Sequence, residues 1–128
     1  MIQRKKAHMN ISFFQVNAFT SRQFAGNPAV VCLPKKWLED DQMQQIAAEN
    51  NVSETAFLVP EEKTLLIRWF TPVTEVALCG HATLAAAYVL SLHFNNCDHS
   101  ISFQTLKSGI LTVSGVEGIY SMKRLGPV

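Results

Sequence analysis

The residues best suited to chemistry stand in the stretch CGHAT, Cys79 to Thr83, which leads into a run of small and apolar residues. Gly80 lets the backbone turn sharply into a helix, whose first N–H groups have no partner within it. Such a terminus favours an anion, for example a substrate carboxylate. His81 either donates a hydrogen bond or a proton to a bound molecule, or simply caps the helix. Gly80, His81 and Ala82 are therefore candidate substrate-binding residues.

Cys79 has two interpretations. A helix N-terminus lowers the pKa of a thiol, which would make Cys79 a thiolate base. Most unpaired cysteines are inert and behave as small hydrophobes, and we favour this second interpretation. Of the other cysteines, Cys32 lies inside the apolar run AVVCL and is expected in the core, and Cys97 is expected on a loop.

A carboxylate stands at a helix-to-strand junction in NNVSETAF, Asn50 to Phe57. Glu54 follows an amphipathic helix and enters a strand, so its side chain can project into a cleft and act as a general acid or base. Ser53 directly precedes it. Considered alone, Glu54 is more typical of an ordinary surface glutamate.

A third stretch, FAGNP, has the composition of a turn. Gly26 permits a positive φ, and Pro28 favours an extended conformation for Asn27. Asn27 either hydrogen bonds to a substrate or holds a neighbouring loop, and turn geometry alone explains it equally well.

The strands and helices that position these residues are predicted from the periodicity of apolar residues. Apolar and β-branched runs predict strands at Ile11–Phe19, Ala29–Leu33, Thr55–Val59, Thr64–Phe70, Ser100–Leu106, Gly109–Gly115 and Gly118–Lys123. Leu38–Asn50 has the spacing of an amphipathic surface helix. His81–Leu92 is apolar on every side, so it must be surrounded by protein. We expect an α+β fold, a curved and mainly antiparallel sheet wrapped around one central apolar helix.

Composition excludes several classes of protein. The chain has 128 residues and a formal net charge of +1, which gives no reason to expect nucleic acid or a membrane surface as a partner. Its three cysteines lack metal or disulfide spacing, and neither a GxGxxG motif nor a P-loop occurs. We therefore expect a cytoplasmic protein with no metal or cofactor, and a flexible tail at residues 1–10.

Taken in order, VNAFTSRQFAGNPAVVCL, MQQIAAENNVSETAFL and IRWFTPVTEVALCGHATLAAAYVL resemble the PhzF-like proteins, named for an isomerase of phenazine biosynthesis. The resemblance runs from about Ile11 to Met122. It implies the diaminopimelate epimerase fold, in which two similar domains, each a sheet barrel around a central helix, enclose the active site. This chain resembles the first domain only, so residues 11–128 are expected to form a single domain, with the second one absent.

The resemblance also implies roles for individual residues. Glu54 matches the family's acid–base glutamate, which moves a proton between carbons of the substrate. Gly80 and His81 match the Gly-His pair that lines the pocket, and Asn27 matches the Asn of GNP near the cleft. Cys79 stands where related racemases carry a catalytic cysteine, but Glu54 fits the PhzF-like pattern better. We therefore do not expect Cys79 to be catalytic.

The expected function is that of a cofactor-independent isomerase or epimerase. Glu54 would shuttle a proton on a small carboxylated metabolite, with Asn27, Ser53, Gly80, His81 and Ala82 as the substrate-binding residues. The alternative is a catalytically incomplete half-length homologue that acts as a small-molecule-binding or protein-interaction module. A homodimer would bring two Glu54 residues together and imitate the missing pair of domains.

Overall fold

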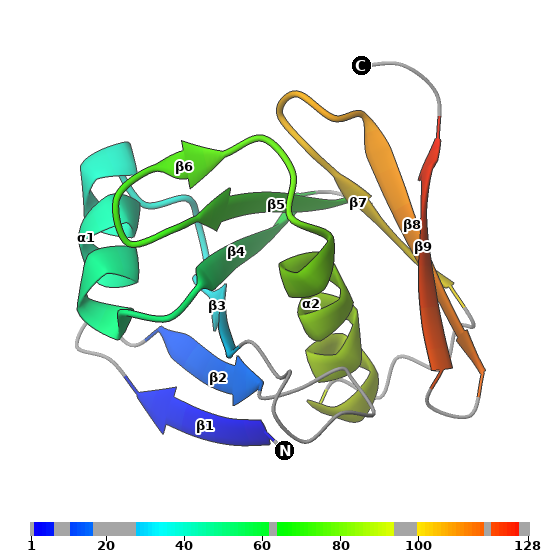
Figure 1. Cartoon of the computed structure of the whole chain (residues 1–128), viewed down its shortest axis with the longest axis horizontal. Helices are drawn as coiled ribbons and strands as arrows, with labels where there is room; N and C mark the ends of the chain where they lie inside the picture. Colours follow the sequence, from blue (N-terminus) through cyan, green and yellow to red (C-terminus); the bar gives the residue numbers. More distant parts are fainter. Residues whose placement is uncertain are drawn as a thin grey trace.

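A curved β-sheet that wraps around one helix forms the body of the protein (Figure 1). The computed structural model describes residues 2–6, 11–16, 28–61, 64–93, 100–116 and 119–125. In chain order the elements are β1 (Ile2–Lys6), β2 (Ser12–Val16), β3 (Ala29–Leu33), α1 (Asp40–Asn50), β4 (Glu54–Glu61), β5 (Thr64–Phe70), β6 (Glu75–Val76), α2 (Gly80–His93), β7 (Ser100–Gln104), β8 (Ile110–Val116) and β9 (Ile119–Leu125).

The strands lie in the order β1-β2-β3-β4-β5-β7-β8-β9, and the two-residue strand β6 pairs with β5 off this path. Within the described residues, β3 with β4 and β5 with β7 are parallel pairs, and the other pairs are antiparallel. A parallel pair needs a long crossover connection. The chain accordingly passes through α1 between β3 and β4, and through α2 between β5 and β7. The predicted α+β class and mainly antiparallel sheet are confirmed.

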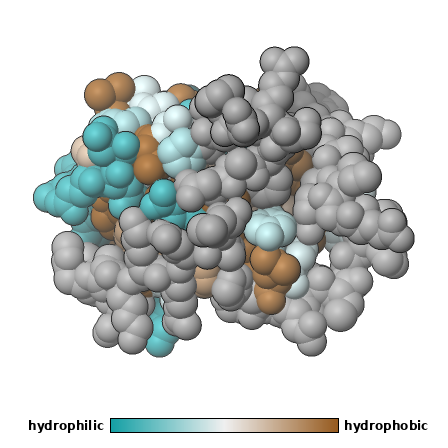
Figure 2. Space-filling view, turned by 60° about the horizontal axis from the view of Figure 1, so that its bottom comes forward, coloured by the Kyte–Doolittle hydropathy of each residue, from teal (hydrophilic) through white to brown (hydrophobic). Residues whose placement is uncertain are grey.

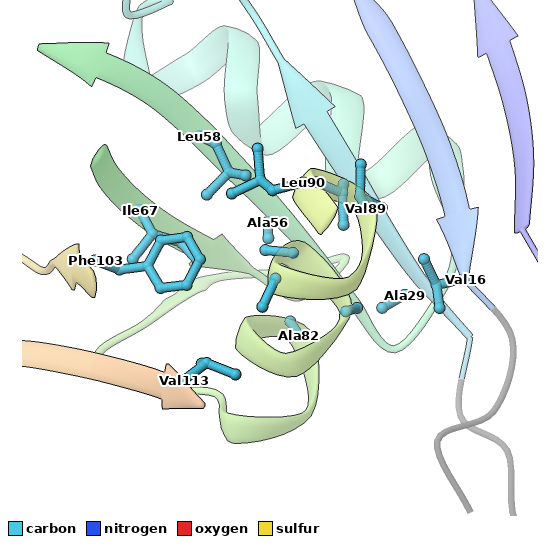
Figure 3. Close-up of a cluster of buried hydrophobic side chains, with 14 of the residues drawn as sticks. Val16, Ala29, Ala56, Leu58, Ile67, Ala82, Val89, Leu90, Phe103 and Val113 are labelled. Atoms are coloured by element: carbon cyan, nitrogen blue, oxygen red, sulfur yellow. The ribbon is translucent and has the colours of Figure 1, made fainter. Parts of the chain in front are cut away.

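Helix α2 lies inside the curve of the sheet, against β3 and β4 on one side and β8 and β9 on the other (Figure 1). Its alanines are buried, and Ala82, Ala85 and Ala86 have no exposed surface. Side chains from six strands converge on the helix in Figure 3, namely Val16, Ala29, Ala56, Leu58, Ile67, Phe103 and Val113. Small residues on α2 let these strands approach it closely, since protein interiors pack without voids. The predicted central apolar helix is confirmed.

The same strands present alternate side chains to the outer face of the sheet, where α1 covers them. In β4, Ala56 and Leu58 belong to the cluster around α2. Phe57, between them in sequence, packs instead with Met43 and Ala47 of α1. Each face of the sheet therefore buries its own apolar cluster. A slip of β4 by one residue would turn each of its side chains to the opposite face of the sheet.

Helix α1 is amphipathic, as its spacing predicts. Hydrophilic residues gather on the side of the molecule that carries α1, at the left of Figure 2. The exposed positions of the helix are mostly polar, namely Asp40, Asp41, Gln45, Ala48 and Glu49. At its start, Glu39 and Gln42 form a capping box, in which each side chain accepts a hydrogen bond from the other residue's backbone N–H.

The N-terminal segment differs from the expected flexible tail over part of residues 1–10. Residues Ile2–Lys6 form β1, which pairs with β2 so that Ile2 lies opposite Val16. The charged sequence of β1 gives little strand signal, but backbone N–H and C=O groups can extend an open strand edge whatever the side chains are. Strand β6 was not expected either, because two residues are too few to show periodicity.

Replacing Ala86 with leucine should overfill the space between α2 and the sheet. We expect the free energy of unfolding to fall by about 1–3 kcal/mol, since forcing methylenes into a packed core displaces its neighbours. Urea denaturation measures this change. The matched control is Ala48→Leu on the exposed face of α1, where a change within about 0.5 kcal/mol is expected. Equal effects at both positions would contradict the tight packing around α2.

Candidate active site

Glu54 is the first residue of β4 and is half-buried. It lies beside Ala29 in the parallel register of β3 and β4. Helix α1 ends just before it at Asn51, whose φ of 51° is left-handed and whose N–H donates to the Ala47 carbonyl at 3.2 Å. This left-handed cap turns the chain sharply, so the strand begins only a few residues after the helix. The local sequence therefore places Glu54 at a defined position at the start of β4.

The start of α2 is held by a chain of buried hydrogen bonds. Thr83 donates from its backbone N–H at 3.1 Å and from its Oγ1 at 2.7 Å, in both cases to the carbonyl of Cys79. The Trp69 indole Nε1–H donates to Thr83 Oγ1 at 3.0 Å. Trp69 and Thr83 are both almost fully buried. Strand β5 thus fixes the backbone of Cys79 through a single side chain of α2.

The loop that leads to α2 is also anchored from outside. Arg68 of β5 makes a bidentate pair with Glu75, at 2.8 Å from Nε and 2.7 Å from Nη2. Its third nitrogen reaches Asp40 of α1 at 3.0 Å. Further along, Ser108 Oγ donates to the Ala77 carbonyl at 2.8 Å. These contacts fix the path of the chain on both sides of the loop, so Cys79 occupies a defined position.

The side chain of Cys79 lies close to both parts of the site. The N–H groups of Ala82 and His81, in the first turn of α2, and the carboxylate of Glu54 all act on the pKa of its thiol. The start of β4 and the start of α2 therefore lie near one another, although they are far apart in sequence.

The thiol of Cys79 stays protonated at neutral pH. Burial raises its pKa to about 11, and the negative charge of Glu54 and its hydrogen bond act in the same direction. The N–H groups of Ala82 and His81 pull the pKa down, but they do not outweigh burial and Glu54 together. This direction disfavours a thiolate at Cys79, as we expected from the sequence. Cys32 is fully buried in β3, also as expected.

The other predicted site residues have different positions. Gly80 is the first residue of α2, and His81 is half-buried in its first turn. The side chain of Ala82 is fully buried, so only its backbone N–H can serve a site. Ser53 is exposed immediately before Glu54. Asn27 and Cys97 lie outside the described residues.

Sequence reasoning missed the supporting role of Trp69 and Thr83. Both residues belong to motifs that the sequence shows, Trp69 to RWFTP and Thr83 to CGHAT. Both residues are of types that usually find a hydrogen-bond partner when buried, but nothing in the sequence shows that they are partners of each other.

An apolar cavity of about 400 Å³ is a rival location for a small molecule. It lies beside Leu90 in the C-terminal half of α2 and is lined by apolar side chains and Lys35. Of the described residues that line it, only Lys35 is titratable, so it offers no carboxylate for acid–base chemistry. In the described ranges no group of three His, Cys, Asp or Glu side chains could hold a metal ion. No helix within them is long and apolar enough to cross a membrane.

This sheet and central helix are those of a known family. The sequence profile of the phenazine biosynthesis-like (PhzC-PhzF) proteins matches residues 16–124. The match covers most of the chain, and the chain therefore belongs to the phenazine biosynthesis-like family. The resemblance carried by GNP, NVSET, RWFTP and CGHAT is confirmed.

Relatives and solved structures agree with this assignment. A protein described as an uncharacterized isomerase from Pseudomonas aeruginosa is 54% identical over 106 residues, which are 83% of this chain and 40% of that protein. The crystal structure of a PhzF-family protein from Enterococcus faecalis is 46% identical, with a TM-score of 0.78 over 84% of this chain and 41% of that one. A predicted epimerase from Pseudomonas aeruginosa is 25% identical, with a TM-score of 0.66 over 82% of this chain and 39% of its own. The fold is of the diaminopimelate epimerase type, and the chain spans about 40% of the length of the relative it matches at 54% identity.

Replacing Thr83 with valine keeps its shape but removes the acceptor of the Trp69 N–H. We expect the free energy of unfolding to fall by about 1–3 kcal/mol, the cost of an unsatisfied buried donor. Chemical denaturation checks the change. Thr112→Val is the matched control, because the Thr112 hydroxyl pairs with Ser102 at an exposed position. If Thr83→Val costs no more than Thr112→Val, the Trp69–Thr83 bond does not hold the start of α2.

Proposed function

We propose that this chain is a cofactor-independent isomerase or epimerase domain in which Glu54 shuttles a proton on a small carboxylated metabolite. The observation that carries the proposal is that Glu54 lies near enough to Cys79, the residue before α2, to raise the pKa of its thiol, which places an acid–base group close to a helix N-terminus. A relative described as an isomerase supports the class of reaction. The described cysteines, Cys32 and Cys79, are free thiols, which suits a reducing cytoplasm, and we propose that location.

In the proposed reaction the Glu54 carboxylate removes a proton from a carbon next to the substrate carboxylate. The electron pair of the broken C–H bond spreads onto the carboxylate oxygens, where the N–H groups of Gly80, His81 and Ala82 stabilise the charge. Donors that are oriented before the reaction stabilise such a charge most effectively. Glu54 then returns the proton to another position or to the other face of the carbon. Isomerisation is complete with no net change in atoms or electrons.

The remaining groups bind and orient the substrate. Its anionic end accepts hydrogen bonds from the N–H groups of His81 and Ala82, since an ionised carboxylate is a strong acceptor. The His81 side chain orients this end or donates a hydrogen bond to it. Ser53 and Asn27 are proposed to contact the substrate next to Glu54.

The 54% identical relative is longer, and this chain spans only about 40% of its length. The isomerase activity of the whole relative is therefore a proposal for this chain. A homodimer is the proposed way for this chain to bring a second set of catalytic groups to the site. The non-catalytic module is not favoured, since a relative is described as an isomerase.

Replacing Glu54 with glutamine should nearly abolish proton exchange, because an amide cannot take up the substrate proton. The measurement is incorporation of solvent deuterium by NMR, with a panel of small carboxylic acids that carry an acidic C–H bond. General acid–base catalysis contributes about 10²–10⁴-fold, so we expect a loss of at least 100-fold in the exchange rate of any acid that the unaltered chain exchanges.

The control for this experiment is Glu49→Gln, which makes the same change on the exposed face of α1. Circular dichroism should show that both variants are folded. Exchange retained in Glu54→Gln would remove Glu54 from the mechanism. Absence of exchange with every acid in the unaltered chain would contradict the activity itself.

A further inference from the structure

The apolar cavity of about 400 Å³ lies where the last turn of α2 faces three strands of the sheet. It is lined by Leu90 of α2, Leu33 of β3, Leu58 and Pro60 of β4, and Leu65 of β5. Leu90 follows Gly80 by ten residues along the helix. At 1.5 Å per residue this is about 15 Å along the helix axis, so the cavity and the candidate active site lie toward opposite ends of α2.

The cavity has an apolar floor and a rim that reaches solvent. Leu58 and Leu90 are buried and form the floor, and they lie close together in Figure 3. Leu33 and Leu65 are half-buried, whereas Pro60 is exposed. Water finds few hydrogen-bond partners in such a space, but a hydrocarbon chain placed there loses its contact with water.

The size and lining of the cavity suit a small molecule. Ligand sites in proteins have volumes of about 300–1,000 Å³, a mostly apolar lining, and a few polar groups that set the orientation of the ligand. Leucine and proline make up most of this lining, and no aromatic ring is among the described residues that form it. The lining therefore favours an aliphatic chain over a stacked aromatic ring.

A positive charge stands at the rim. Lys35 lines the cavity and is exposed, and within the described ranges it has no ion-pair partner. Glu61 follows Pro60 at the end of β4 but does not line the cavity. An anionic head group is thus the charge that complements this rim.

The end of α2 also affects where such a head group can lie. The last turn of a helix carries a partial negative charge, which disfavours an anion close to its carbonyl groups. The head group is therefore expected on the side of Lys35, away from the helix end. The hydrocarbon chain would then extend inward to Leu58 and Leu90.

We propose that this cavity binds a short aliphatic carboxylate, with the chain on the apolar floor and the head group at Lys35. The site is separate from the one at Glu54, and its existence does not depend on the proposed reaction. A ligand in it would contact α2, the helix whose first turn belongs to the candidate active site.

Octanoate is the probe for this site, and NMR titration of the full chain is the measurement. We expect saturable shifts of the methyl signals of Leu58, Leu65 and Leu90. Hexanoate should bind more weakly by roughly fourfold for each CH₂ that it lacks, because fewer methylenes are buried. Shifts centred on the amide of Thr83, with the three leucines unmoved, would place octanoate at the active site and overturn the proposal.

Lys35→Gln tests the head group at an exposed position, where the fold is not at risk. It should weaken octanoate binding about 2- to 5-fold, the scale of an exposed ion pair, and leave octanol binding unchanged. The matched control is Lys36→Gln at the next exposed position, which should change neither. Equal losses in both variants would contradict the role of Lys35. Tighter binding of octylamine than of octanoate would also overturn the anionic assignment.

Leu65→Phe tests the cavity itself, because it adds volume to a half-buried part of the lining. Saturable binding of octanoate and octanol should disappear, while circular dichroism shows the variant to be folded. Full binding in a folded Leu65→Phe variant would mean non-specific association of an amphiphile and would overturn the proposal. Glu54→Gln should leave octanoate binding unchanged, so this site and the proposed proton transfer fail in separate experiments.

Discussion

Burial of α2 is the constraint on which the rest of the structure depends. A helix apolar on every side must be enclosed, and its first N–H groups have no partner within the helix. The first turn is held at its start, because the N–H and Oγ1 of Thr83 both donate to the Cys79 carbonyl. The site is thus built on a helix start that the fold had to stabilise in any case.

Topology brings Glu54, the proposed acid–base group, to this part of the fold. The crossover through α1 makes β4 parallel to β3, so Glu54 begins its strand beside Ala29. The hairpin partner β5 contributes Trp69, which reaches the same first turn of α2 from the sheet. The two motifs separated in sequence, NVSET and CGHAT, therefore depend on one strand pair for their alignment. A change in register of β4 or β5 would separate Glu54 from Cys79.

The sequence predicted those features that depend on local pattern. The bounds of β3 match the expected strand, and α2 begins one residue before the expected helix, because apolar runs and turn residues mark such elements. The environment of Cys79 could not be predicted, since its protonation depends on burial and on Glu54, both set by tertiary packing. Strand β1 was missed because the RKK sequence does not reveal which sheet edge lies beside it. Family motifs pointed to Glu54, His81 and Cys79, but not to the effect of the Glu54 carboxylate on the pKa of the thiol.

The central claim is that the bonds from Thr83 to the Cys79 carbonyl hold the first turn of α2, with Thr83 itself held by Trp69. Residue-by-residue amide hydrogen exchange by NMR tests it most directly, because exchange reports local opening. We expect the amide of Thr83 to be protected about as well as those of Ala85 and Ala86 in the middle of the helix. Exchange of the Thr83 amide at the rate of a free amide, with the middle still protected, would contradict the account.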